Sequence, residues 1–178
     1  MPAQATDLLM IERAGTPYKL PISGLPSGAD PWTYLKLAAD QDVLTATWTD
    51  LSGLAFTPAA NTDYEVEFCL MCQTPTATVG ARPGLSWGTG YQYGVADLYT
   101  PTAATTESIV HQTIGTAAGT AQAAAGGLPV VNVPYGHRGM VTFRSGTTPT
   151  PFKLQMASET AGTAIRIKAG SYLKFRAI

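Results

Sequence analysis

Apolar and polar side chains alternate with a period of two over several short stretches of this 178-residue chain. Such alternation gives a β-strand one buried face and one hydrated face. The alternating stretches are residues 64–70, 152–156, 165–167 and 172–177. Segments containing glycine and proline, such as residues 82–84 and 145–149, separate them and are typical of turns. The pattern predicts an all-β fold, an antiparallel β-sandwich or barrel.

Two segments are harder to assign. Residues 30–39 begin with Asp and Pro, which suit the start of a helix, but the Trp, Thr, Tyr and Leu that follow suit a strand equally well. We favour a strand. Residues 113–127 are mostly Ala, Gly and Thr, which are too small to anchor a core, so we expect a long loop or an irregular edge there.

The N-terminal segment is organised differently from the rest. Residues 8–13 and 18–22 each have the pattern of a short apolar strand, and residues 14–17 between them contain the Gly and Pro of a turn. A two-stranded hairpin by itself is marginally stable in water, so this one needs a partner: the main domain, another subunit or a larger assembly. Residues 23–31 have the composition of a linker. We therefore expect an arm and linker at residues 1–30 and a β-sandwich at residues 31–178.

Charged side chains make up only 13% of the chain, and the net charge is -1. A near-zero charge argues against nucleic-acid binding, which needs a concentrated basic surface, and it leaves little repulsion between copies. Residues 1–89 hold nine acidic and four basic side chains, whereas residues 90–178 hold three acidic and seven basic ones. In an oligomer this polarity would let one end of a subunit face the opposite end of its neighbour. The alternative is that the charges are scattered over the fold without consequence.

Targeting and cysteine patterns predict a soluble protein of a reducing compartment. The N-terminus lacks the basic and apolar regions of a signal peptide, and no apolar run approaches the roughly 18 residues of a membrane helix. Cys69 and Cys72 are too close in sequence to join distant parts of a fold. On a strand, residues three apart point to opposite faces, so we expect two structural cysteines with neither a disulfide nor zinc.

Histidine-based chemistry has little support in the sequence. His111 and His137 are the only histidines, and a Ser–His–Asp arrangement would have to combine His137 with Asp97. The GxSxG pattern, which can present a nucleophilic serine on a strand-to-helix turn, occurs once, as GLSWG at residues 84–88, but no helix pattern follows it. We therefore expect no enzyme, no metal site and no cofactor.

Three carboxylates share one face of a predicted strand. Asp63, Glu65 and Glu67 follow one another at intervals of two positions, so neighbours in this series lie about 7 Å apart, which is compatible with glycoside hydrolysis. We expect a hydrated strand face instead. The remaining alternatives are a cation site or ionic contacts with Arg166 or Lys168 of an adjacent subunit.

A glycine-rich segment at residues 88–94 predicts a loop with aromatic side chains around it. The glycine spacing does not fit a dinucleotide-binding turn. Exposed aromatic side chains on such a loop would suit a sugar-binding or protein-binding tip, and packing against the end of the sandwich is the alternative. The aromatic residues in question are Trp87, Tyr91, Tyr93 and Tyr99.

Several segments resemble a domain that recurs in virion proteins of tailed bacteriophages. They are WTYLKLAAD at residues 32–40, WTDLSGLAFTPAANTDYEVE at 48–67, GARPGLSW at 80–87, LQMASETAGT at 154–163 and KAGSYLKFR at 168–176. The segment DLLMIERAGTPYKL at residues 7–20 also resembles one found early in phage fibre-type proteins, where it connects the chain to other subunits. The resemblance covers residues 31–178 and implies a trimeric β-sandwich of jelly-roll type.

The resemblance further implies a structural virion protein that is assembled in the cytoplasm of the bacterial host. Since the chain has no long repetitive shaft, we favour a small homotrimeric capsid decoration or head-fibre protein over a tail fibre. Its partners would be other copies of itself and the major capsid protein or other virion proteins, without nucleic acid or membrane. Anchoring to the particle would use Leu8, Leu9, Met10, Ile11, Tyr18, Leu20 and Ile22.

Two other functions remain open at this stage. One is a tail-fibre or receptor-binding tip that binds a host-surface glycan through Trp87, Tyr91, Tyr93 and Tyr99. The other is a short capsule-degrading enzyme that would depend on Glu65.

Overall fold

The computed structural model describes residues 8–13, 16–21, 31–103, 106–122, 126–127 and 130–178. The chain divides into two compact units, Met1–Pro31 and Trp32–Ile178. In the first unit, β1 (Leu8–Arg13) pairs antiparallel with β2 (Thr16–Pro21). The second strand of this hairpin therefore starts two residues earlier than the sequence pattern predicted.

The second unit consists of strands. They are β3 (Thr33–Lys36), β4 (Gln41–Val43), β5 (Thr49–Phe56), β6 (Asp63–Gln73), β7 (Gly80–Trp87), β8 (Tyr91–Ala103), β9 (Thr106–Ile114), β10 (Gly119–Gln122), β11 (Gly126–Gly127), β12 (Tyr135–Ser145), β13 (Phe152–Ser158), β14 (Ile165–Ile167) and β15 (Tyr172–Ala177). The predicted all-β fold is confirmed, and the segment after Pro31 is a strand, as favoured above.

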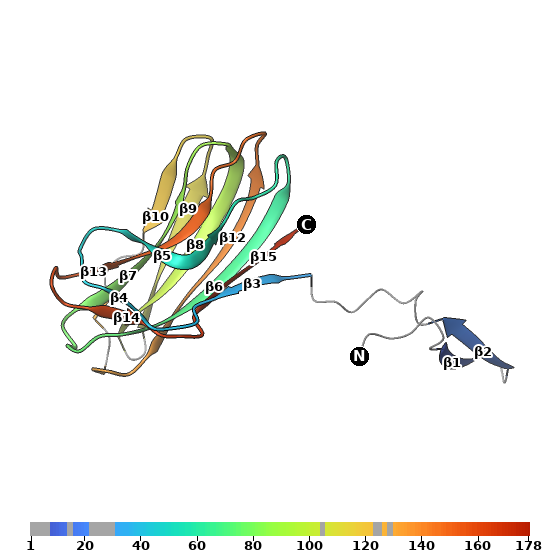
Figure 1. Cartoon of the computed structure of the whole chain (residues 1–178), viewed down its shortest axis with the longest axis horizontal. Coiled ribbons are helices and arrows are strands. Elements are labelled where there is room, and N and C mark those ends of the chain that lie inside the picture. The colour runs from blue at the N-terminus through green and yellow to red at the C-terminus, as the bar shows by residue number, and fades with distance from the viewer. Residues whose placement is uncertain (1–7, 14–15, 22–30, 104–105, 123–125, 128–129) are drawn as a thin grey trace. The chain divides into compact units, whose positions relative to one another are not determined.

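These strands form two antiparallel sheets that pack against each other as a β-sandwich (Figure 1). The larger sheet has the order β3-β15-β6-β12-β8-β9, with β14 beside β6 and β4 beside β14. The smaller sheet has the order β10-β7-β13-β5, with β11 beside β7. Strands that follow one another in the chain thus often lie in different sheets, and most pairing is between segments far apart in sequence.

The strand order supports the jelly-roll type, which itself stays a prediction. Without the additional strands β4, β8, β9, β11 and β14, eight strands remain in two groups of four. We number these eight strands in chain order. Across the larger sheet they then lie in the order first, eighth, third and sixth (β3, β15, β6, β12), and across the smaller sheet in the order second, seventh, fourth and fifth (β5, β13, β7, β10). A double-sheet jelly roll likewise places eight strands in two sheets.

The core lies between the inner faces of the two sheets. Alternate residues of β6 and β12 are buried, as the period-two pattern requires. Within the core, aromatic rings gather from five strands, with the Phe56 and Phe175 rings stacked at 3.8 Å between centroids. Tyr64, Phe143 and Phe152 extend this cluster. Aromatic pairs of this kind add about 0.5–1.5 kcal/mol each beyond the area they bury.

Two expectations about loops are corrected by the strands. Of residues 88–94, expected as a loop, residues 91–94 belong to the long strand β8, and the turn before it is confined to residues 88–90. Residues 113–127, expected as a long loop or an irregular edge, contain the end of β9 and the short strands β10 and β11, which pair with β7. For residues 113–127, the expected irregular edge therefore agrees better with the structure than the expected long loop.

Candidate interaction surface

We call the outward side of the larger sheet the outer face. Alternation along each strand determines which side chains lie on it, because neighbouring strands place their opposed residues on the same side. Tyr172, Cys69, Arg138 and Tyr99 form one row across β15, β6, β12 and β8, and Lys174, Glu67, Met140 and Asp97 form the next.

Each carboxylate of the predicted acidic strand face is paired with a cation of the same chain. Asp63 accepts a hydrogen bond of 2.5 Å from Arg144, and Glu65 accepts two from Arg176. Glu67 lies 2.9 Å from the Lys174 ammonium, and this hydrogen bond raises the pKa of Lys174.

Arg166 and Lys168 were alternatives for ionic contacts with the acidic strand face of an adjacent subunit, but within the chain they pair with other carboxylates. Arg166 forms a two-pronged pair with Asp42, and Lys168 pairs with Asp40. The hydrogen bond from each cation lowers the pKa of its carboxyl partner.

The uneven charge of the two chain halves is balanced within the fold. Six of the eight ion pairs in the described residues join an acid from residues 1–89 to a base from residues 90–178. The other two, His111 with Asp97 and Arg138 with Glu107, lie on the outer face. The carboxylates of this face therefore already have partners in the same chain.

The two histidines occupy opposite environments. His111 is exposed, and its Nδ1 lies 2.6 Å from Asp97 Oδ1, so Asp97 pairs with His111 rather than with His137. His137 is fully buried, and neither ring nitrogen has a hydrogen-bond partner in the described part of the chain. Burial lowers the pKa of His137 to about 4. The hypothetical combination of His137 with Asp97 is therefore wrong.

The cysteines have the arrangement expected for a strand. Cys69 is half-buried on the outer face, Cys72 is buried in the core, and both are free thiols. Burial raises the pKa of both thiols. Within the described ranges, the structure brings no three His, Cys, Asp or Glu side chains together as a metal site. Over the same ranges, no helix is long and apolar enough to cross a membrane.

The four predicted loop aromatics do not form one site. Trp87 is buried, and its indole nitrogen donates a hydrogen bond to the Ala117 carbonyl. Tyr91 is also buried, with its hydroxyl donating to the Thr150 carbonyl, and burial raises its pKa. Tyr93 and Tyr99 lie on β8 and point to the outer face. The alternative of packing against the sandwich thus holds for Trp87 and Tyr91.

Most of the exposed large apolar side chains lie on the outer face. Six of the ten large apolar residues that are exposed in the described part of the chain belong to it: Tyr34, Tyr93, Val95, Ile109, Met140 and Ile178. Tyr93 and Val95 are the most exposed on β8, at 59% and 58%. Tyr93, Val95 and Ile178 line one hollow together, and contiguous exposed apolar residues mark surfaces that bind other molecules.

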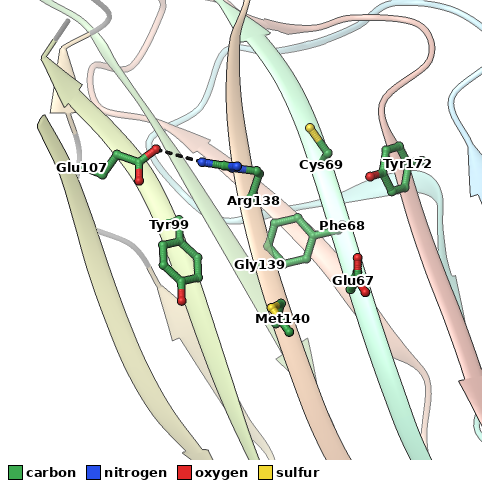
Figure 2. Close-up of a pocket in the computed structure, with 9 residues that line it drawn as sticks. All are labelled: Glu67, Phe68, Cys69, Tyr99, Glu107, Arg138, Gly139, Met140 and Tyr172. Atoms are coloured by element: carbon green, nitrogen blue, oxygen red, sulfur yellow. Dashed lines mark hydrogen bonds and ion pairs between the residues drawn. The ribbon is translucent and has the colours of Figure 1, made fainter. Parts of the chain in front are cut away.

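A groove of about 390 Å³ crosses the middle of this face (Figure 2). Tyr99 stands on one side of the groove and Tyr172 on the other, three strands apart. Arg138 reaches across toward β9 and donates to Glu107 at 3.1 Å. Met140 and Glu67 continue the lining along the strands.

A small residue makes room for the groove. Cys69 lies between the two tyrosines in the row, beside Arg138. Gly139 faces the inner side of the sheet, and the Phe68 ring occupies the space where its side chain would lie. A second hollow, of about 350 Å³, lies farther along the face and is lined by Asp63, Tyr93, Gly94, Val95, Thr142, Phe143 and Ile178.

Most of the groove residues were missed by the sequence analysis. Arg138, Met140 and Tyr172 were assigned no role, although they occupy outward positions of alternating strands. Their outward position in the alternating pattern could have identified them as surface residues. The pattern does not show which strands lie side by side, so it could not identify a groove. The predicted anchoring residues cannot be placed on any surface: the side chains of Leu8, Leu9, Met10, Ile11, Tyr18 and Leu20, and all of Ile22, lie outside the described residues.

No family model and no curated protein matches this chain.

Proposed function

We propose that the chain is a small structural protein of a tailed-phage virion, a homotrimeric capsid decoration or head-fibre protein. The phage setting rests on the resemblance of residues 7–20 and 31–178. The observation that supports self-association is the concentration of exposed apolar residues on the outer face. In this proposal the virion is the site of action, and the partners are two further copies and a capsid or other virion protein.

The physical basis is the burial of apolar area without an opposing charge penalty. Each square ångström of apolar surface removed from water contributes roughly 25 cal/mol. Each carboxylate on the outer face already has a partner in the same chain, Lys or Arg in four pairs and His111 in the fifth, so a second copy brings no unpaired carboxylate into the contact. A net charge of -1 adds little repulsion between copies.

The role of the N-terminal unit in this proposal is attachment. Its hairpin is a separate compact unit of two strands, a size that gains stability from a partner surface. The proposal assigns that partner to the particle. No step of the proposed function requires a chemical reaction.

The first test is the native mass of the full-length protein, by light scattering after size exclusion. A mass about three times 18.7 kDa is the expected result. A monomer at all attainable concentrations contradicts the homotrimer.

The second test separates attachment from assembly. A variant lacking residues 1–25 should keep the trimer mass but no longer sediment with particles that lack the native protein. Full-length protein at the same concentration is the control. A truncated protein that decorates particles normally contradicts the assignment of the arm.

A glycan-binding tip is the second candidate, and the groove between Tyr99 and Tyr172 is the observation that favours it. Tyrosine rings on two sides of a groove suit the apolar faces of a sugar. Glycan-array binding that is lost on Tyr99→Ala and Tyr172→Ala, but kept on Leu44→Ala, would support this candidate. Binding that survives both tyrosine substitutions would contradict it.

A further inference from the structure

We propose that acid opens one end of the sandwich locally and that protonation of His137 is the trigger. We call this part the His137 end: residues 70–72 of β6, 98–100 of β8, 108–110 of β9 and 135–139 of β12, which lie side by side in the larger sheet. The inference concerns the fold itself, so it goes beyond the proposed function and does not depend on it.

His137 is buried in the core without a hydrogen-bond partner. Neither Nδ1 nor Nε2 has a donor or acceptor within reach in the part of the chain that the structure describes. Continuing the register of β12 and β8 by one pair places Thr100 opposite His137, and over the same residues the Thr100 hydroxyl is also buried and unpartnered. A neutral imidazole tolerates this position, but an imidazolium there would be a buried charge without a compensating hydrogen bond. Opening of the sheet is the change that hydrates it.

The neighbouring strands of the larger sheet supply no compensating charge on the inner side. The titratable side chains on the same face as His137 are the Cys72 thiol and the Tyr135 phenol, which are uncharged in acid like other thiols and phenols. The charged residues of β6, β8, β9, β12 and β14 lie on the outer face, where they form the ion pairs given above. Burial therefore lowers the pKa of His137 to about 4 with no neighbouring charge to oppose it.

The charged residues of the smaller sheet also point away from the core. Asp50 of β5 binds Lys153 of β13, and the Arg82 guanidinium of β7 lies over the Trp48 ring. Glu159, directly after β13, is exposed and accepts a backbone hydrogen bond. Strands β10 and β11 contain no charged residue. A protonated His137 thus has no counter-ion inside the described part of the sandwich.

The opposite end of β12 is packed around aromatic rings, and we call it the aromatic end: residues 64, 91, 143 and 152. Phe143 lies six residues beyond His137, about 20 Å along the strand. Its ring centroid is 5.5 Å from those of Tyr64 and Phe152 and 5.1 Å from that of Tyr91. These contacts are far enough from His137 to persist when the other end opens.

The His137 end lacks such contacts along its inward row. Across β12, β8 and β9 this row is His137, Thr100 and Ser108, all of them polar. Pro101 follows in β8 without an N–H to donate, and the pairing of β8 with β9 shifts register after it. β9 is also the last strand of the sheet. Segments with few apolar contacts and an interrupted ladder open at the lowest free energy.

Opening at this end also disrupts the groove of the outer face. Arg138 and Tyr99 are the chain neighbours of His137 and Thr100, and they point to the other side of the sheet, where they line the groove. Separation of β8 from β12 moves these two side chains apart. The groove is therefore complete only while the His137 end is closed.

The ionisation of His137 sets the size of the effect. A histidine exposed by opening has a pKa of about 6.5, whereas burial lowers it to about 4 in the closed state. The open state thus binds the proton more tightly, and the ratio of open to closed molecules increases as the pH falls. Between pH 7 and pH 5 this ratio should increase about 20-fold.

Hydrogen exchange of the full-length protein, followed by NMR at pH 7 and pH 5, measures this ratio at each amide. After correction for the intrinsic exchange rates, amide protection at the His137 end should fall about 20-fold in the wild type. His137→Leu should abolish the fall. His111→Gln is the matched control, because it removes the other, exposed histidine and should leave the fall unchanged.

Urea distinguishes a local opening from global unfolding. At pH 5 and urea concentrations below the unfolding transition, exchange at the His137 end should be nearly independent of urea, because a local opening exposes little surface. Exchange at the aromatic end should accelerate with urea. The same urea dependence at both ends would show global unfolding and would overturn the inference.

The histidine variants decide whether His137 is the trigger. A fall in protection of less than about 3-fold in the wild type overturns the inference, and so does a full fall in His137→Leu. If His137→Leu does not fold, His111→Gln still provides the test, since His137 is then the only histidine in the chain. A His111→Gln protein whose protection at the His137 end no longer depends on pH would assign the effect to His111 instead.

Discussion

Gly139 lies on the inner side of β12, where the Phe68 ring fills the space that a side chain would need. A Cβ atom there would overlap the ring and come within 3.0 Å of the Asp97 carbonyl oxygen. We expect Gly139→Ala to lower the free energy of unfolding by about 1–3 kcal/mol, the usual cost of overpacking. Urea unfolding measures this effect.

Gly136 on the same strand is the matched control. It faces outward, and the nearest atom to an added Cβ is the Cys69 Sγ at 3.8 Å, an ordinary contact. Gly136→Ala should change the free energy of unfolding by less than about 0.5 kcal/mol. Equal losses in the two variants would contradict the packing argument.

His137 should make the stability of the sandwich depend on pH. Burial lowers its folded-state pKa to about 4, whereas an unfolded chain has a histidine pKa of about 6.5. The unfolded state therefore binds a proton first as the pH falls. The contribution of His137 is present above about pH 6.5 and is lost progressively down to about pH 4, by about 3 kcal/mol in total.

Unfolding free energies of wild type and His137→Leu at pH 7, 6, 5 and 4 test this dependence. The difference between the two proteins should change by about 3 kcal/mol across that range, with the wild type losing more. Thr100→Val is the control, since Thr100 is buried like His137 but does not titrate. A wild type and His137→Leu with parallel pH profiles would contradict the prediction.

At the scale of the element, β8 shows how glycine misleads sequence interpretation. Three glycines at positions 88, 90 and 94 suggested a loop, but they have different functions. Gly90 has a positive φ of 88° in the turn, where glycine is favoured. Gly94 lies within the strand, and an added Cβ there would meet the Phe143 side chain at 2.6 Å. A glycine that permits close packing looks the same in sequence as one that makes a turn.

The two faces of β8 should respond differently to substitution. Leu98 is fully buried, so Leu98→Ala should cost about 2–5 kcal/mol of unfolding free energy through lost contacts and a cavity. Its neighbour Asp97 faces outward in an exposed ion pair with His111, so Asp97→Ala should cost less than about 1 kcal/mol. Chemical denaturation of both variants checks the strand and its register. A larger loss for Asp97→Ala would show that the register is wrong.

At the scale of the molecule, the division into two units predicts independent folding of the sandwich. The unit Trp32–Ile178 has its own core, and a compact unit with its own core can fold by itself. A variant lacking residues 1–25 should therefore keep the melting temperature of the full-length protein within about 2 °C. Differential scanning calorimetry of the two proteins provides the comparison. A drop of more than about 5 °C would contradict independent folding.

Much of the fold could be predicted from local patterns, but much less of the surface could. Alternation was sufficient to locate β6, β13, β14 and β15, because burial of one strand face leaves a period-two signal in the sequence. The outer-face groove combines β6, β8, β12 and β15, whose pairing joins residues as far apart as Phe68 and Leu173. No local pattern states which strands become neighbours, so the groove was not predicted.

The sequence by itself determined the β class, the strands with clear alternation and the low, nearly balanced charge. These properties depend on the order and the kinds of residues. Only the tertiary structure decided that Asp63, Glu65 and Glu67 are paired with Arg144, Arg176 and Lys174, and that Trp87 and Tyr91 are buried. The physical reason is that hydrogen-bonded strand pairing brings together residues about a hundred positions apart, and that pairing sets the surroundings of each side chain.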